Sequence, residues 1–262
     1  MEFHVSITAG NDQAKGTADQ PFRTISRAAA LAMPGDTVIV HAGVYREWVN
    51  PAHGGTAEHR IVYRSAGDGE VVITGAERIT DWMDEGDNVW STEVPNSIFS
   101  VRNPFEVELS GDWLFDGAFP VHLGDVYLDC KSLYECDSLE KVHKPEVWSD
   151  AKYSEDSLLT WYAEVGSVTT KIWANFGGKD PRKENVEISV RPYCFWPEKQ
   201  GLNYITISGF TLRQASPQWA PPTDYQEGLI GPHWSKGWII ENNIIYESKS
   251  VGISLGTAIG TG

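Results

Sequence analysis

The sequence has no long apolar stretch and no targeting segment at its start. No run approaches the ~18 apolar residues that a membrane span needs. Residues 1–7 (MEFHVSI) contain no basic patch followed by an apolar run, so we expect no secretory signal. These absences exclude a membrane protein and predict a cytoplasmic location.

Cysteine is scarce, and the three thiols form no recognisable pattern. Cys130, Cys136 and Cys194 are odd in number, lack CxxC spacing and have no His cluster nearby. A disulfide framework and a zinc site are both disfavoured by this arrangement. We therefore expect three reduced structural thiols, no metal and no cofactor.

Basic residues are also in deficit. Lys and Arg number 21 against 36 Asp and Glu, which gives a formal net charge of -15. This charge argues against nucleic acid or an anionic membrane as partner. Hydrophobic residues make up 41% of the chain, and 25 Gly, 14 Pro, 11 Trp, 10 Tyr and 9 Phe favour a turn-rich β architecture over a helix bundle.

The charge is concentrated in the middle of the chain. Residues 1–76 carry 8 acidic and 6 basic side chains, residues 77–200 carry 24 and 12, and residues 201–262 carry 4 and 3, so the nets are -2, -12 and -1. The middle segment also holds seven of the eleven tryptophans. Residues 77–200 are therefore predicted to form a separate domain between two related flanking segments.

Both flanking segments contain short β-branched runs separated by turn residues. The runs are 36–40, 60–63 and 70–75 in the first segment and 204–212, 238–246 and 251–255 in the last. Such spacing without intervening helices predicts a parallel β-helix, with Asn242 and Asn243 at a corner between strands. A loop of a β-sandwich is the alternative reading of this pair.

One helix is expected, over 21–33, with Phe22, Ile25, Ala29 and Met33 on one stripe. A solenoid needs its open end covered, so this helix is predicted to cap it. Residues 256–262 follow the last strand without a cap of this kind, which suggests a C-terminally incomplete β-helix.

Several motifs resemble known β-helix proteins. The stretch 21–47 is similar to the opening of right-handed parallel β-helices of the pectate-lyase type. GVYREWV at 43–49, GDWL at 111–114, HLGDVYL at 122–128, WYAEV at 161–165 and GLIGP at 228–232 together resemble the N-terminal part of glycoside hydrolase family 120, the β-xylosidases. The resemblance covers essentially the whole chain.

This resemblance implies a β-helix interrupted by a β-sandwich, with the active site where the two meet. The acidic middle segment would be the sandwich, with strands at 88–94, 125–128, 159–165, 170–176 and 186–190. It also implies a retaining xylosidase that uses two carboxyl groups, roughly 5 to 5.5 Å apart. In relatives these groups come from later coils, so the catalytic residues are unknown here and expected beyond Gly262. Asp224, Glu227, Glu241 and Glu247 are expected to be solvated or turn carboxylates.

Tryptophans are the remaining candidates for substrate binding, because a sugar ring packs its C–H face on an indole. Trp113 lies in a Gly/Asp turn, and Trp219 and Trp234 lie on predicted loops. The alternative roles are a domain-interface anchor for Trp113 and core or loop packing for the other two. His122 and His233 are expected to be structural.

The leading hypothesis is the N-terminal portion of a retaining exo-β-xylosidase that acts on xylo-oligosaccharides or another small saccharide and is inactive by itself. A pectate-lyase-like polysaccharide lyase is disfavoured because 201–262 contains only one Asp for a Ca²⁺ cluster. A non-catalytic carbohydrate-binding or structural module is the third hypothesis. Association into a homo-oligomer stays open.

Overall fold

The computed structural model describes residues 1–111, 114, 117, 119–151, 153–221 and 224–255. Its architecture is all-β, with four sheets and two short α-helices in the described part of the chain. No helix there is long and apolar enough to cross a membrane. The chain forms two compact units, Met1–Gly75 with Pro192–Gly262, and Ala76–Arg191.

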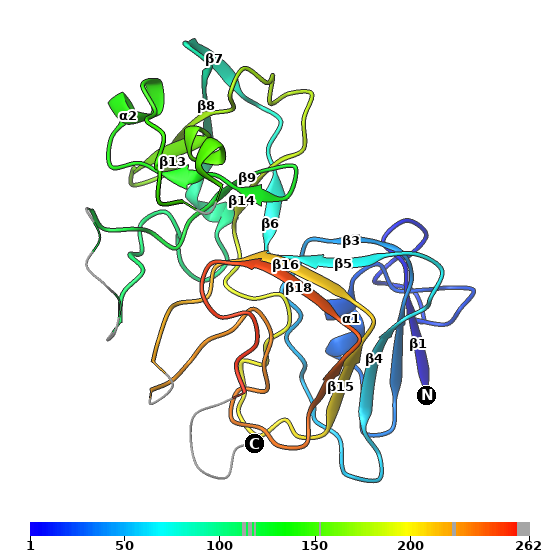
Figure 1. Cartoon of the computed structure of the whole chain (residues 1–262). Helices are drawn as coiled ribbons and strands as arrows, with labels where there is room; N and C mark the ends of the chain where they lie inside the picture. Colours follow the sequence, from blue (N-terminus) through cyan, green and yellow to red (C-terminus); the bar gives the residue numbers. More distant parts are fainter. Residues whose placement is uncertain (112–113, 115–116, 118, 152, 222–223, 256–262) are drawn as a thin grey trace. The chain divides into compact units, whose positions relative to one another are not determined.

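The first unit is built from two parallel sheets (Figure 1). One has the order β1-β2-β4-β15-β17 and the other β18-β16-β5-β3, and every pairing in both is parallel. The strands are β1 (Glu2–Val5), β2 (Thr37–Val40), β3 (Gly43–Tyr45), β4 (Ile61–Ser65), β5 (Val71–Thr74), β15 (Ile205–Ser208), β16 (Thr211–Ala215), β17 (Ile239–Glu241) and β18 (Ile244–Ser248). The β-branched runs of the flanking segments thus form strands, except that 251–255 contributes one bridge.

A third column of contacts completes each coil. Val49, Phe195, Ile230 and Ile253 form successive parallel bridges outside the named strands. Each coil therefore runs through one strand of each sheet and then through one of these residues. This order is consistent with the predicted β-helix, and the insert lies between β5 and Phe195 in the second coil.

The corners between the two sheets depend on left-handed backbone. Gly209 has φ 83° and Asn242 has φ 55° at matching places in successive coils. The side-chain Nδ2 of Asn243 donates to the Ile207 carbonyl at 3.0 Å, and its side-chain Oδ1 accepts from the backbone N–H of Phe210 at 2.9 Å. The corner predicted for Asn242 and Asn243 is therefore confirmed.

The expected helix over 21–33 is much shorter in the structure. Helix α1 spans Ile25–Ala29, where Thr24 caps the first turn by accepting from the Arg27 amide at 3.1 Å. Ile25 and Ala29 are buried in the core with Phe22, whereas Met33 is 51% exposed. The predicted stripe is thus wrong at its last position, because the chain has already left the helix there.

The second unit consists of two mainly antiparallel sheets around its own core. One has the order β10-β9-β14-β6 and the other β11-β12-β13-β8-β7. The strands are β6 (Ala76–Arg78), β7 (Met83–Gly86), β8 (Val89–Pro95), β9 (Val126–Leu128), β10 (Lys131–Ser132), β11 (Tyr134–Glu135), β12 (Thr160–Val165), β13 (Thr169–Asn175) and β14 (Val186–Ser189), with helix α2 at Leu139–His143. All five strands expected in the middle segment are present, and this pair of sheets is consistent with a β-sandwich.

The unit boundaries differ slightly from the segment boundaries read from charge. Residues 192–200 lie in the first unit, since Phe195 pairs with Val49 and Ile230 in the third column. At the base of the second unit, Ala76 faces Ser189 across the antiparallel pair β6 and β14. The chain thus enters and leaves this unit on neighbouring strands.

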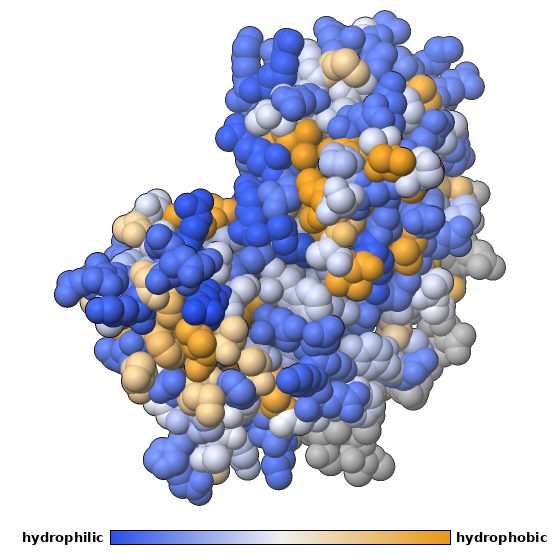
Figure 2. All heavy atoms as spheres, turned by 180° about the vertical axis from the view of Figure 1, so that it is seen from behind, coloured by the Kyte–Doolittle hydropathy of each residue, from blue (hydrophilic) through white to orange (hydrophobic). Residues whose placement is uncertain are grey.

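The surface is largely hydrophilic, in keeping with the high negative charge. Figure 2 shows one face on which hydrophilic residues predominate and apolar residues form separate patches. Four apolar residues of the last described coil are exposed: Ile239, Ile244, Ile253 and Leu255. This coil thus presents apolar side chains to solvent.

Candidate functional site

Aromatic rings gather on the loops that connect the parallel strands of the first unit. We call them the aromatic cluster: Trp48, Tyr193, Trp196, Tyr225, His233 and Trp234. Tyr193 lies edge-on to Trp48 with centroids 5.2 Å apart and stacks on Trp196 at 5.3 Å. Trp196 stacks on His233 at 5.6 Å. The rings thus form a continuous set drawn from three loops.

The cluster has a buried base and an accessible rim. Trp196 is 2% exposed, and the Trp48 indole donates to its carbonyl oxygen at 2.7 Å. Tyr225 is 39% exposed, lies 5.5 Å from His233 and stacks on Trp234 at 6.5 Å. Apolar ring faces at the rim are what the C–H face of a sugar requires.

A carboxylate accompanies the rings. The Tyr193 hydroxyl donates to Oε1 of Glu227 at 2.7 Å, and the backbone N–H of Gln218 donates to Oε2 of Glu227 at 2.9 Å. The expectation of a solvated carboxylate is therefore wrong for Glu227, which is half-buried with both oxygens engaged. Because protein groups donate to both of its oxygens, the Glu227 carboxylate is suited to hold Tyr193 and the Gln218 backbone in position.

The loop that carries His233 and Trp234 has an unusual backbone. Their φ angles are 47° and 62°, and non-glycine residues adopt this left-handed region infrequently. The His233 Nδ1 donates to the Pro197 carbonyl at 2.6 Å, since a carbonyl can only accept, and this fixes the tautomer. At Gly231 an added Cβ would lie 2.5 Å from a ring carbon of Trp196. The packing around this loop must therefore enforce the left-handed backbone, and a side chain at position 231 would clash with the Trp196 ring.

Of the three predicted tryptophans, one belongs to this site and a second is next to a contacting residue in the sequence. Trp234 belongs to the aromatic cluster. Trp219 is half-buried, and its backbone N–H donates to the side-chain oxygen of Gln218 at 2.9 Å. The backbone N–H of the same Gln218 donates to Glu227. Trp113 lies outside the described residues.

The sequence did not single out Tyr193, Trp196 or Trp48, nor the partner of Glu227. Tyr193 and Glu227 are 34 positions apart on different loops, so no local spacing signals their contact. Among the other carboxylates, Asp224 and Glu241 are exposed as expected, whereas Glu247 is half-buried. Glu247 has φ 51°, again a left-handed backbone.

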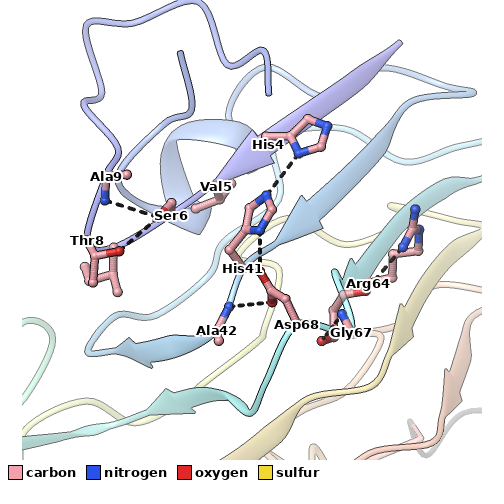
Figure 3. A network of polar contacts seen from close by, with 12 residues as sticks. His4, Val5, Ser6, Thr8, Ala9, His41, Ala42, Arg64, Gly67 and Asp68 are labelled. Carbon is pink, nitrogen blue, oxygen red and sulfur yellow. Dashed lines mark hydrogen bonds and ion pairs between the residues drawn. The ribbon is translucent and has the colours of Figure 1, made fainter. Parts of the chain in front are cut away.

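A second polar network lies on strand β1 and on the ends of strands β2 and β4 with the turns that follow them (Figure 3). His41 Nδ1 donates to Asp68 Oδ2 at 2.6 Å, and His4 Nδ1 lies 3.1 Å from His41 Nε2. This hydrogen bond from His41 holds the pKa of the Asp68 carboxyl below its usual value. The network connects three successive strands or turns, which is a structural role.

His122, in the second unit, has a partner that the sequence did not reveal. Its Nδ1 donates to Oε1 of Glu135 at 2.6 Å, and its backbone amide donates to Oε2 at 2.9 Å. Thirteen residues and a turn separate the two. Over the described part of the chain, no group of three or more His, Cys, Asp or Glu residues could hold a metal ion.

Comparison with known proteins finds a family match in each unit. Residues 79–188 match the family model "Glycoside hydrolase 120, insertion domain", and residues 8–51 match DUF1565, a family of unknown function. A solved structure, "The complex structure of XylC with xylose", is 48% identical with a TM-score of 0.91 over 94% of this chain and 40% of that chain. The chain thus spans well under half the length of this relative.

Two other matches are more distant. The uncharacterized protein YwoF of Bacillus subtilis (strain 168) is 29% identical over 102 residues, which are 39% of this chain and 19% of that protein. A structure titled "Glycoside hydrolase" shares 13% identity and a TM-score of 0.50 over 82% of this chain and 51% of that chain, a likeness of fold alone.

Parallel coils with an antiparallel insert describe the class of fold to which the chain belongs. Residues 79–188 match the insertion domain of glycoside hydrolase family 120, and the chain is similar to XylC over 94% of its length. These two matches relate the chain to that family.

Proposed function

We propose that the chain is the N-terminal portion of a retaining exo-β-xylosidase that hydrolyses xylo-oligosaccharides. The observation that carries the proposal is the 48% identity and TM-score of 0.91 to XylC, whose structure is titled as a complex with xylose. The family resemblance implies that the catalytic carboxylates lie beyond Gly262, and this chain spans only 40% of that protein.

The proposal includes the finer architecture. Residues 1–76 and 201–262 would form one right-handed parallel β-helix, and 77–200 would form an inserted β-sandwich. The three columns of parallel pairing support the first part, and the two antiparallel sheets support the second. Trp219, Trp234 and Trp113 remain the proposed sugar contacts, and Tyr225 joins them because its ring is exposed beside Trp234.

Two assays on the purified 262-residue chain test this function. With an aryl β-D-xyloside we expect no turnover, and turnover above background would show that the catalytic pair is already present. Titration with D-xylose should quench tryptophan fluorescence, and Trp234→Ala should weaken this binding at least tenfold. Unchanged binding in Trp234→Ala would remove the aromatic cluster from the sugar site.

The same preparations separate the alternatives. A chelator-sensitive rise in absorbance on pectate would favour a polysaccharide lyase. Binding of xylose without hydrolysis, even in a protein extended by the downstream coding sequence, would favour a carbohydrate-binding module.

A further inference from the structure

The corner between strands β4 and β5 contains a chemically labile pair of residues, Asp68 and Gly69. In an Asp-Gly pair, the absence of a side chain on the glycine lets its backbone nitrogen approach the aspartate carboxyl group closely. The sequence has one other such pair, Asp116 and Gly117, and no Asn-Gly pair. The side chain of Asp68 is 47% exposed, so water reaches it. This corner is therefore a candidate site of spontaneous backbone modification.

The stacking of the coils requires the glycine of this pair. Gly69 has φ 153°, and a Cβ added there would lie 2.8 Å from the Cβ of Ala42, between β2 and β3 of the preceding coil. Another residue at position 69 would therefore displace that turn. The Gly69 N–H makes no hydrogen bond within the part of the chain that the structure describes. The nitrogen that would react is thus present and not held by the protein.

Two donors from the preceding coil hold the Asp68 carboxylate. His41 Nδ1 donates to Asp68 Oδ2 at 2.6 Å, and the backbone N–H of Ala42 donates to Asp68 Oδ1 at 3.0 Å (Figure 3). Attack on the carboxyl carbon must expel one of these two oxygens. Whichever oxygen leaves, one of the two hydrogen bonds is lost. We call this pair of hydrogen bonds the Asp68 clamp.

The clamp also holds the carboxyl group in its unreactive form. The hydrogen bond from His41, followed by that from the Ala42 N–H, keeps the pKa of Asp68 below its usual value, because both bonds favour the ionised group. An oxygen can leave as water from the neutral acid, whereas the ionised carboxylate has no such leaving group. The Asp68 clamp therefore reduces the population of the reactive neutral acid.

We propose that Asp68 is a site of isoaspartate formation and that His41 restrains this reaction. The Gly69 nitrogen attacks Cγ of Asp68 and loses its proton, an N–Cγ bond forms, a Cγ–O bond breaks and water leaves, which gives a cyclic succinimide. Water then opens the ring at the carbonyl next to Cα, and the main chain afterwards runs through Cγ. This inference goes beyond the proposed function, because it involves no sugar and no residue of the aromatic cluster.

The modification would lengthen a connection between two paired strands. β4 pairs with β2 and β5 pairs with β3, so both ends of the corner are fixed by the preceding coil. Isoaspartate adds one methylene group to the main chain between them. The restraint by His41 would thus preserve the stacking of the coils as well as the peptide bond.

The test follows isoaspartate at Asp68 while the folded 262-residue chain is incubated at physiological temperature and neutral pH. Liquid chromatography and mass spectrometry of digests separate the modified peptide, and methylation by protein isoaspartyl methyltransferase identifies it. His41→Ala should accumulate isoaspartate at Asp68 several-fold faster than the parent chain, whereas the rate at Asp116 in the same digests should not change. Equal rates at Asp68 in the two proteins would overturn the proposal, as would an equal rise at Asp116.

Two further variants separate the hydrogen bond from a general effect on folding. His41→Asn keeps a side-chain N–H that can donate to Asp68, so its rate should stay near that of the parent. His4→Ala is the matched control, because it removes the contact with His41 Nε2 at 3.1 Å and leaves the donor to Asp68 in place. It should react like the parent. A rate in His41→Asn equal to that in His41→Ala would contradict the proposal.

The parent chain alone provides a second measurement. Held unfolded in guanidinium chloride, it has no Asp68 clamp and should form isoaspartate at Asp68 several-fold faster than the folded chain. A folded chain that reacts as fast as the unfolded one would overturn the proposal without recourse to any variant.

Discussion

Two buried tyrosines in the core of the first unit differ in the hydrogen bonding of their hydroxyl groups. Tyr45 and Tyr63 are both fully buried. The Tyr45 hydroxyl donates to the His41 carbonyl at 2.8 Å and accepts from the Ile7 amide at 3.2 Å. The Tyr63 hydroxyl has no partner among the described residues. The same functional group is thus satisfied at one position and unsatisfied at the other.

This contrast predicts opposite effects of the same substitution. Tyr63→Phe should raise the free energy of unfolding by about 1 kcal/mol, because it removes an unpaired buried hydroxyl. Tyr45→Phe should lower it by about 1–2 kcal/mol, because the Ile7 amide loses its acceptor. Urea unfolding of both variants measures the difference. A loss of stability in Tyr63→Phe equal to that in Tyr45→Phe would contradict the assignment.

The pKa of Tyr45 predicts an alkaline limit to stability. Burial raises this pKa from 10.0 to about 12, although the Ile7 amide hydrogen bond opposes the rise. The folded-state pKa therefore exceeds the unfolded-state pKa. The resulting stabilisation is fully present below about pH 10 and is lost as the pH rises through 12. Unfolding free energies measured from pH 8 to 12 should fall less steeply in Tyr45→Phe than in the parent chain.

Among the structural elements, strands β4, β15 and β17 are connected by one arginine. Arg60, just before β4, donates through Nε to Thr206 Oγ1 at 2.9 Å and through a terminal nitrogen to the Ile205 carbonyl at 3.0 Å. The same nitrogen donates to the Gly237 carbonyl, just before β17. One guanidinium therefore spans three successive coils.

A single ammonium group cannot reproduce this geometry. Arg60→Lys should lower the free energy of unfolding by about 1–2 kcal/mol, on the scale of one or two lost hydrogen bonds. Arg64→Lys is the control, because Arg64 is exposed on β4 and donates to the Ser65 carbonyl. Thermal unfolding followed by circular dichroism compares the two, and equal losses would show that Arg60 does not connect the coils.

Strands and corners could be predicted from the sequence because their signals are local. The β-branched runs and the pair Asn242–Asn243 specify strand and left-handed corner within a few residues. The third column of bridges could not be predicted, since one bridging residue per coil leaves no hydrophobic periodicity in the sequence. The length of α1 was overestimated because the Ala-rich run 28–32 favours helix, whereas the chain after Ala29 turns toward β2.

The candidate site was less predictable than the fold. Trp234 could be found from its loop composition. Tyr193 and Trp196 of the same cluster follow the insert, and the contact of Trp196 with His233 forms only through the stacking of coils. The contact between His122 and Glu135 could not be predicted, because it depends on the pairing of short strands at a sheet edge. Contacts of this kind depend on topology, which local patterns do not encode.

At the scale of the whole molecule, the last described coil leaves two strand edges open. Among the described strands, β17 pairs only with β15, and β18 pairs only with β16. Ile244 on β18 is 62% exposed. Unpaired edges with exposed apolar side chains promote association between chains.

We therefore expect the purified 262-residue chain to self-associate as its concentration rises. Ile244→Lys should shift the molar mass toward that of the monomer, because edge lysines oppose strand pairing. Val168→Lys places the same charge on the second unit and should have no effect. Size-exclusion chromatography with light scattering measures the molar mass of the parent chain and of both variants. A parent chain that stays monomeric at high concentration would disprove the expectation.

The adjacent ends of the inserted unit bear on how the chain reaches its native state. Ile61 must align with Ile205 across an interval that contains the entire insert, and closing so long a loop carries an entropic cost. Pairing of Ala76 with Ser189 shortens that interval to the two segments 61–76 and 189–205. Prior folding of the insert should therefore favour the pairing of β4 with β15, and we expect a destabilising substitution of the buried Ile188 to slow refolding of the first unit.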